Sequence, residues 1–128
     1  MIPTITPLYA ALAALILVAL TFRVILLRNK FKVPVGDGGH IEVERAIRAH
    51  GNFIEYVPLA LLLILLCELT GASARTVHGL GAALIVARLA HAWGLSANEG
   101  VSAGRGIGII LTIFVLIGAA VRLLLHYI

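Results

Sequence analysis

The sequence has few charged residues and a single cysteine. Only 12% of its 128 residues are charged, whereas soluble domains average about a quarter. Cys67 is alone, which excludes a disulfide bond within the chain. No basic residue precedes Arg23, so the first apolar stretch lacks the basic start of a secretory signal peptide, and we expect a membrane helix instead. No basic cluster with interleaved aromatic residues occurs, and we expect no nucleic-acid partner.

Apolar residues dominate the chain. They make up 61% of it, and its mean hydropathy is +1.07. Four apolar stretches, together with their flanking residues, reach or approach the roughly 20 residues that a membrane-spanning helix needs. The sequence therefore predicts an all-α membrane protein. We expect residues 1–128 to form a single domain, a four-transmembrane-helix bundle with helices at about 6–28, 41–70, 74–96 and 103–127.

Lysine and arginine are unevenly distributed along this predicted bundle. Arg28, Lys30, Lys32 and Arg45 fall around the first loop, on the same side as Arg105. Cytoplasmic loops carry an excess of Lys and Arg. We therefore expect the N- and C-termini to lie outside and the first and third loops to lie in the cytoplasm.

A polar stripe marks the beginning of the second predicted helix. At about 100° per residue, its members share an arc of roughly 120° on one helix face. A polar face that enters an apolar protein should contact something charged and accessible to water. The stripe consists of Glu44, Arg45, Arg48, Asn52, Glu55 and Tyr56.

Two ionisable residues interrupt the third predicted helix. Arg88 and His91 are three positions apart and share a helix face. Ionisable residues inside membrane spans are functional hypotheses by default, and Glu55 is the acidic partner we expect for Arg88. The alternative is a structural ion pair that only holds helices together. We expect Glu68 to be a charge at the membrane interface, and the Cys and His spacing predicts no metal site.

The polar residues also resemble a family signature. Glu44-Arg45-x-x-Arg48-Ala49-x-x-Asn52-x-x-Glu55-Tyr56-x-Pro58 is similar to that of the membrane-associated proteins in eicosanoid and glutathione metabolism, the MAPEG superfamily. Ala87-Arg88-x-x-His91-Ala92-x-Gly94 and Arg105-x-x-Gly108, with Thr112, resemble its bacterial branch.

The resemblance implies a fold, an assembly and a cofactor. Family members are homotrimers of four-helix subunits, and many bind glutathione on the cytoplasmic side between subunits. By this resemblance Arg48, Asn52, Glu55 and Tyr56 hold the tripeptide. His91 occupies a position near it, and we add Arg88 to the predicted binding residues. Arg105 corresponds to an arginine that stabilises the glutathione thiolate, which makes it the predicted catalytic residue.

Three functions are compatible with these features. The first is a glutathione transferase or peroxidase of the bacterial inner membrane, which acts on hydrophobic electrophiles or lipid hydroperoxides from the bilayer. The second is a non-catalytic lipid-binding or scaffolding member of the family, which would not need Arg105. The third is a small transporter, but such exporters use a carboxylate in their first helix, and this helix has none.

Overall fold

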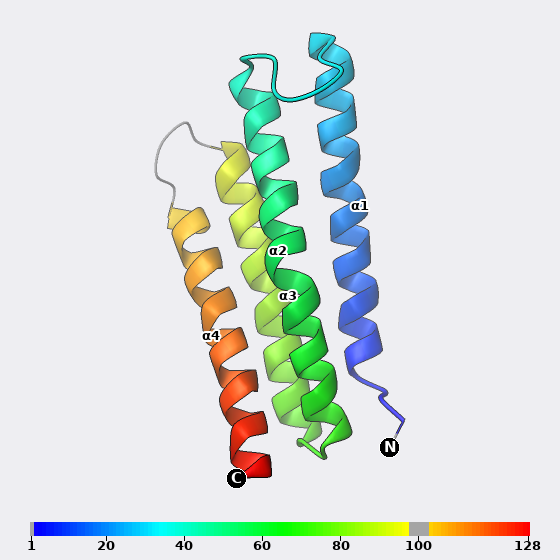
Figure 1. Cartoon of the computed structure of the whole chain (residues 1–128), viewed down its shortest axis with the longest axis vertical. Coiled ribbons are helices and arrows are strands. Elements are labelled where there is room, and N and C mark those ends of the chain that lie inside the picture. The colour runs from blue at the N-terminus through cyan, green and yellow to red at the C-terminus, as the bar shows by residue number, and fades with distance from the viewer. Residues whose placement is uncertain (1, 98–102) are drawn as a thin grey trace.

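The chain folds into four long helices packed side by side. The computed structural model describes residues 2–97 and 103–128, and only the backbone of residues 95–97. The helices are α1 (Thr6–Phe31), α2 (Ile41–Leu69), α3 (Ala74–Ala97) and α4 (Ala103–Tyr127). Both termini lie at one end of the bundle and the α1–α2 loop at the other (Figure 1). The described residues contain no strand, which confirms the all-α prediction.

Helix α1 extends three residues beyond its predicted end at residue 28. The helix ends in a backbone turn at Lys32, which adopts the left-handed conformation with φ of 56°. The N–H of Val33 then donates to the carbonyl of Arg28 at 2.9 Å, and the Val33 side chain is buried. This pairing satisfies a carbonyl that the end of the helix leaves open. The apolar pattern stops earlier, because the last turn of α1 is polar.

Three helices of the described chain are long and apolar enough to cross a membrane: α1, α2 and α4. Helix α3 has 24 residues but is not among them. It carries Arg88 and His91, and both side chains are buried within the bundle. Charged residues in membrane helices face the protein interior rather than lipid. The chain is therefore an all-helical membrane protein in which α3 packs against the three other helices.

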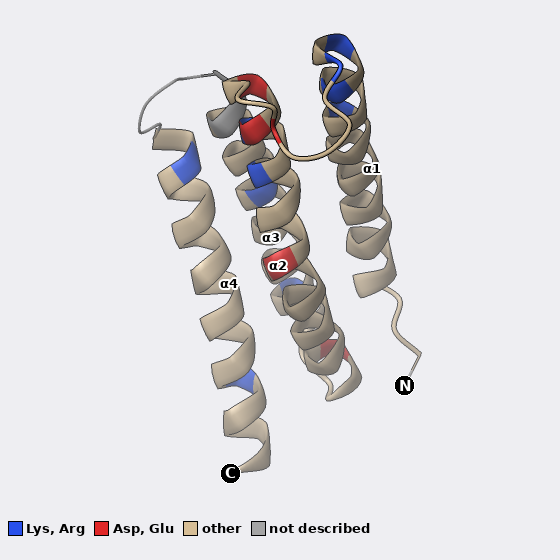
Figure 2. Cartoon of the chain, turned by 45° about the horizontal axis from the view of Figure 1, so that its top comes forward, with Lys and Arg blue, Asp and Glu red and all other residues tan. Residues whose placement is uncertain are grey.

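Charged residues gather toward the end of the bundle that holds the α1–α2 loop (Figure 2). The last turns of α1 contribute Arg28 and Lys30, and the first turns of α2 contribute charges of both signs. Toward the opposite end lie Arg75, in the first turn of α3, and Arg122, in the last turns of α4. The predicted orientation of the protein in the membrane rests on this uneven distribution of Lys and Arg.

Helices α3 and α4 approach each other closely because α4 carries glycines on the facing side. A Cβ atom at Gly108 would lie 2.6 Å from the carbonyl oxygen of Ala87 and 2.7 Å from Cβ of His91. A Cβ atom at Gly104, one turn earlier, would lie 3.0 Å from the carbonyl oxygen of Ala90. Small residues at such positions let helix backbones pack tightly in membranes. Only glycine fits at position 108 without moving one of the helices.

Glu68 connects the end of α2 to the beginning of α1. Its carboxylate accepts hydrogen bonds from the backbone N–H groups of Thr4, Ile5 and Thr6, each at 2.7 Å, and from the Thr6 hydroxyl. The first N–H groups of a helix have no partner within it, and the helix dipole favours negative charge there. Glu68 is buried against the start of α1 at the end of α2. Its position at the membrane interface stays a prediction. Its partners lie more than 60 residues away in sequence, where local patterns give no signal.

We predict that Glu68→Ala lowers the free energy of unfolding by about 1.5–3 kcal/mol, because it leaves several N–H groups of α1 without an acceptor. Glu68→Gln keeps one acceptor oxygen and should lose less. Thermal unfolding of the detergent-purified protein, followed by circular dichroism, measures both. Glu42→Ala is the control, since Glu42 is exposed on α2. Equal melting temperatures for Glu68→Ala and the control would contradict this role.

Candidate functional site

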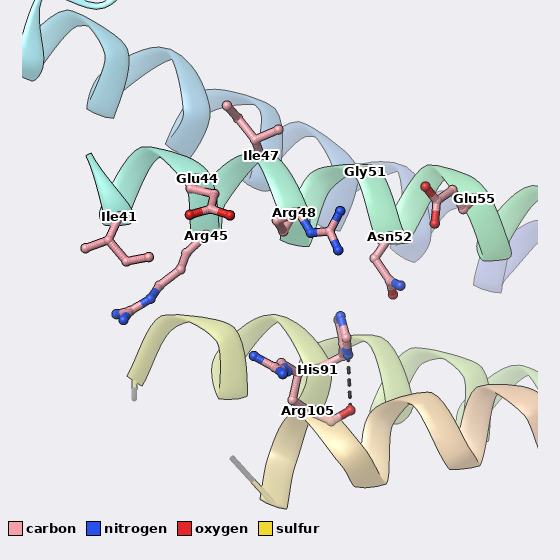
Figure 3. A pocket seen from close by; sticks show the side chains of 10 residues that line it. All are labelled: Ile41, Glu44, Arg45, Ile47, Arg48, Gly51, Asn52, Glu55, His91 and Arg105. Carbon is pink, nitrogen blue, oxygen red and sulfur yellow. Dashed lines mark hydrogen bonds between the residues drawn. The ribbon is translucent and has the colours of Figure 1, made fainter. Parts of the chain in front are cut away.

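A polar cavity of about 520 Å³ lies between the beginning of α2, α3 and the beginning of α4. Its size falls within the range of about 300–1,000 Å³ typical of small-molecule sites. Figure 3 shows the α2 side chains on one wall, with His91 and Arg105 facing them. The lining residues are Ile41, Glu44, Arg45, Ile47, Arg48, Gly51, Asn52, Glu55, His91 and Arg105.

The rotation of α2 places its polar stripe, except Tyr56, in this cavity. Val43, Ala46, Ala49 and Phe53 are buried and fix the opposite face of the helix within the protein. Residues three or four positions apart share a helix face, so the stripe turns toward α3 and α4. The exposed Arg48 and Glu55 line the cavity together with the half-buried Asn52.

Gly51 contributes space rather than a chemical group. It lies three residues after Arg48 on the cavity side of α2. A Cβ atom built at this position meets nothing within 4 Å. A glycine inside a helix costs about 1 kcal/mol relative to alanine. The sequence pattern alone does not assign this role to Gly51, although an isolated glycine between two polar residues of the stripe is a usable signal.

His91 and Arg105 come together through the tight α3–α4 contact. The His91 side chain is 6% exposed, and its Nδ1 lies 3.2 Å from the backbone oxygen of Arg105. The Arg105 side chain lines the cavity from the first turn of α4. The partial positive charge of a helix N-terminus adds to that of the guanidinium. This wall of the cavity therefore favours an anion.

Arg88 hydrogen-bonds to the stripe from a buried position. It is 1% exposed, and its Nη1 donates to Oδ1 of Asn52 at 2.9 Å. Its Nε and Nη2 are buried without a hydrogen-bond partner among the described residues. The prediction that Glu55 pairs with Arg88 is wrong, because Asn52 occupies that place. Arg88 itself does not line the described cavity.

The structure thus separates the predicted site residues into two groups. Arg48, Asn52, Glu55, His91 and Arg105 share the cavity. Arg88 and Tyr56 lie outside its described lining, with Tyr56 half-buried one turn beyond Asn52. Glu44 and Arg45, which belong to the predicted stripe but not to the predicted ligand-binding residues, also line it.

One chain already places its own α3 and α4 beside the polar face of α2. The family resemblance predicts that ligand binding also involves a neighbouring subunit. That contribution stays a prediction, as does the homotrimer.

Comparison with known proteins agrees with these features. Residues 6–125 match the MAPEG family. Two similar proteins, from Escherichia coli strain K12 and from Escherichia coli O6:H1 strain CFT073, are each named inner membrane protein YecN. Each is 44% identical over 90 residues, which cover 70% of this chain and 69% of the relative. No solved structure matches the chain significantly.

The family match extends from the start of α1 to the last turns of α4 and includes every residue that lines the cavity. It therefore confirms the resemblance seen in the helix signatures, and the relatives agree with an integral protein of the inner membrane. The chain belongs to the MAPEG family.

Proposed function

We propose that this protein binds glutathione in the polar cavity and uses its thiol to conjugate hydrophobic electrophiles or to reduce lipid hydroperoxides. The observation that carries the proposal is the cavity itself, which joins three arginines, two glutamates, an asparagine and a histidine inside an apolar bundle. Clustered charges in a membrane protein are costly and mark functional sites.

The charges of the cavity complement those of glutathione. The tripeptide has two carboxylates and one ammonium group. Arg45 and Arg48 offer guanidinium groups that bind carboxylates with paired, charge-assisted hydrogen bonds. Glu55 offers a carboxylate for the ammonium group. This arrangement of both signs supports a zwitterionic ligand over a simple anion.

Arg88 determines how Asn52 can meet such a ligand. A guanidinium only donates hydrogen bonds, so the Asn52 atom that it contacts is the amide oxygen. The Asn52 NH₂ group then remains available to donate to a peptide carbonyl of the ligand. Arg88 would thus act by positioning Asn52 rather than by contact with glutathione.

The thiol would lie at the wall formed by α3 and α4. A fixed guanidinium near a thiol lowers its pKa from the usual value of about 8.5 and increases the thiolate fraction at neutral pH. Arg105 provides this charge in the cavity. The second substrate would arrive from the bilayer, in which the exposed apolar side chains of α4 would lie.

We further propose the assembly and orientation that the family resemblance and the Lys and Arg distribution support. The protein would be a homotrimer with both termini outside. Its cavity would open to the cytoplasm, where glutathione is abundant, because the end rich in Lys and Arg faces that side.

Isothermal calorimetry with glutathione and the detergent-purified protein tests the proposal. We expect saturable binding to the native protein, and at least a tenfold loss of affinity in Arg48→Ala, since a charge-assisted hydrogen bond contributes about 1.5–3 kcal/mol. Arg75→Ala is the matched control, because Arg75 is exposed at the opposite end of α3. No binding to the native protein at millimolar glutathione would contradict the proposal.

A second prediction concerns the space at Gly51. Gly51→Leu should project a side chain into the cavity and strongly weaken glutathione binding while the helices remain intact, because the new side chain meets no existing atom at its Cβ. Gly79→Leu is the control, since it places the same side chain at another open helical glycine outside the cavity lining. Unchanged binding by Gly51→Leu would place the ligand elsewhere.

The roles of Arg105 and Glu55 should be separable. We predict that Arg105→Ala reduces the turnover number far more than glutathione affinity, because the guanidinium acts on the thiolate. Glu55→Ala should mainly weaken binding of the ammonium group. Steady-state kinetics with a nitroaryl halide, together with calorimetry, measures both effects. If the two variants lost turnover and affinity in equal proportion, this division would be wrong.

A further inference from the structure

The orientation of His91 carries an inference that rests on the proposed glutathione site. The imidazole emerges from α3 between the backbone of α4 and the polar face of α2, and it lines the cavity (Figure 3). The Cβ atom of His91 packs directly against Gly108 of α4, where even one added carbon atom would clash with it. Its position is therefore fixed by packing rather than by a bound ligand.

The hydrogen bond of His91 determines its tautomer. The partner of Nδ1 is the backbone carbonyl oxygen of Arg105, at 3.2 Å. A carbonyl oxygen can only accept, so Nδ1 carries the proton and donates it. In the neutral ring Nε2 is then unprotonated. No hydrogen bond to Nε2 occurs among the described residues, and this nitrogen is not among the fully buried unpartnered atoms.

Every helix that forms the cavity contributes charged groups to it or beside it. Helix α3 contributes Arg88 and α4 contributes Arg105, both close enough to act on the His91 ring electrostatically. The α2 wall contributes two further arginines and two carboxylates, namely Arg45, Arg48, Glu44 and Glu55. These guanidiniums favour an anion beside His91 and oppose a proton on the ring by itself, so we expect the ring to hold a proton only together with that anion.

We propose that His91 is the general base that accepts the thiol proton of bound glutathione. The S–H bond breaks, its proton moves to Nε2, and its electron pair stays on sulfur beside Arg105. With an α,β-unsaturated carbonyl compound, the thiolate forms a C–S bond at the β-carbon, and the π electrons move to an enolate. The enolate then takes the proton back from Nε2, so that no external oxidant or reductant is needed. Imidazole is suited to proton exchange at neutral pH.

The test measures how many protons are released when glutathione binds. Calorimetric titrations of the native protein with glutathione, in buffers of equal pH but different ionisation enthalpy, give the number of protons released per ligand bound. Ultraviolet absorbance of the complex gives the thiolate fraction. We expect the native protein to form thiolate without releasing a proton, because His91 retains it.

His91→Asn is the informative variant, since the asparagine amide can still donate to the Arg105 carbonyl but has no basic nitrogen. In this variant we expect thiolate to form only with release of one proton to the buffer, and only at higher pH. The rate of enone conjugation should fall about 10²- to 10⁴-fold, the usual contribution of a general base, with little change in the Michaelis constant for glutathione.

Two results would overturn this role of His91. One is release of a full proton per thiolate by the native protein, a measurement that requires no variant. The other is an unchanged rate and pH profile in His91→Asn. Failure of the native protein to bind glutathione would instead contradict the proposed function, so the two hypotheses fail in different ways.

Discussion

The close contact between α3 and α4 is the constraint on which the candidate site depends. Gly108 and Gly104 allow the α4 backbone to reach the carbonyls of α3. This contact brings the Arg105 backbone to His91 and turns the first turn of α4 toward α2. A bulkier residue at Gly108 would push the helices apart and separate the two groups. The packing of α3 against α4 therefore determines the geometry of the candidate site.

A second constraint is the buried cation of Arg88. Placing an arginine at the centre of a membrane helix costs about 2.5–3.5 kcal/mol on insertion scales. Here the guanidinium has one neutral acceptor, Asn52, and two nitrogens without a partner among the described residues. If Arg88 served only to hold helices together, burying its charge with so few hydrogen-bond partners would be unfavourable. Its geometry agrees better with a role in fixing the orientation of Asn52 at the cavity wall.

The sequence predicted the parts of this structure that depend on local pattern. The long apolar stretches located the helices, and the rotation of about 100° per residue placed Arg48, Asn52 and Glu55 on one face. The tight fit of α4 rests on Gly104 and Gly108, four residues apart, but this spacing does not tell which helix the glycines face.

The parts that depend on how helices align with one another were beyond the sequence. Glu55 was expected to pair with Arg88 because depth along each helix had to be counted without knowing the offset between α2 and α3. That offset brings Asn52 to Arg88 instead. Tyr56 belongs to the same predicted helical face but does not line the described cavity, although Glu55, the residue before it, does. Glu68 finds its partners at the start of α1, a contact that only the folded chain creates.

An experimental structure of the detergent-purified protein with glutathione is the most direct test of the central claim. The account predicts the tripeptide within the cavity of α2, α3 and α4. Its carboxylates should lie beside Arg45 and Arg48, and its sulfur beside Arg105 and Nε2 of His91. Glutathione bound at any other surface, with this cavity empty, would contradict the assignment.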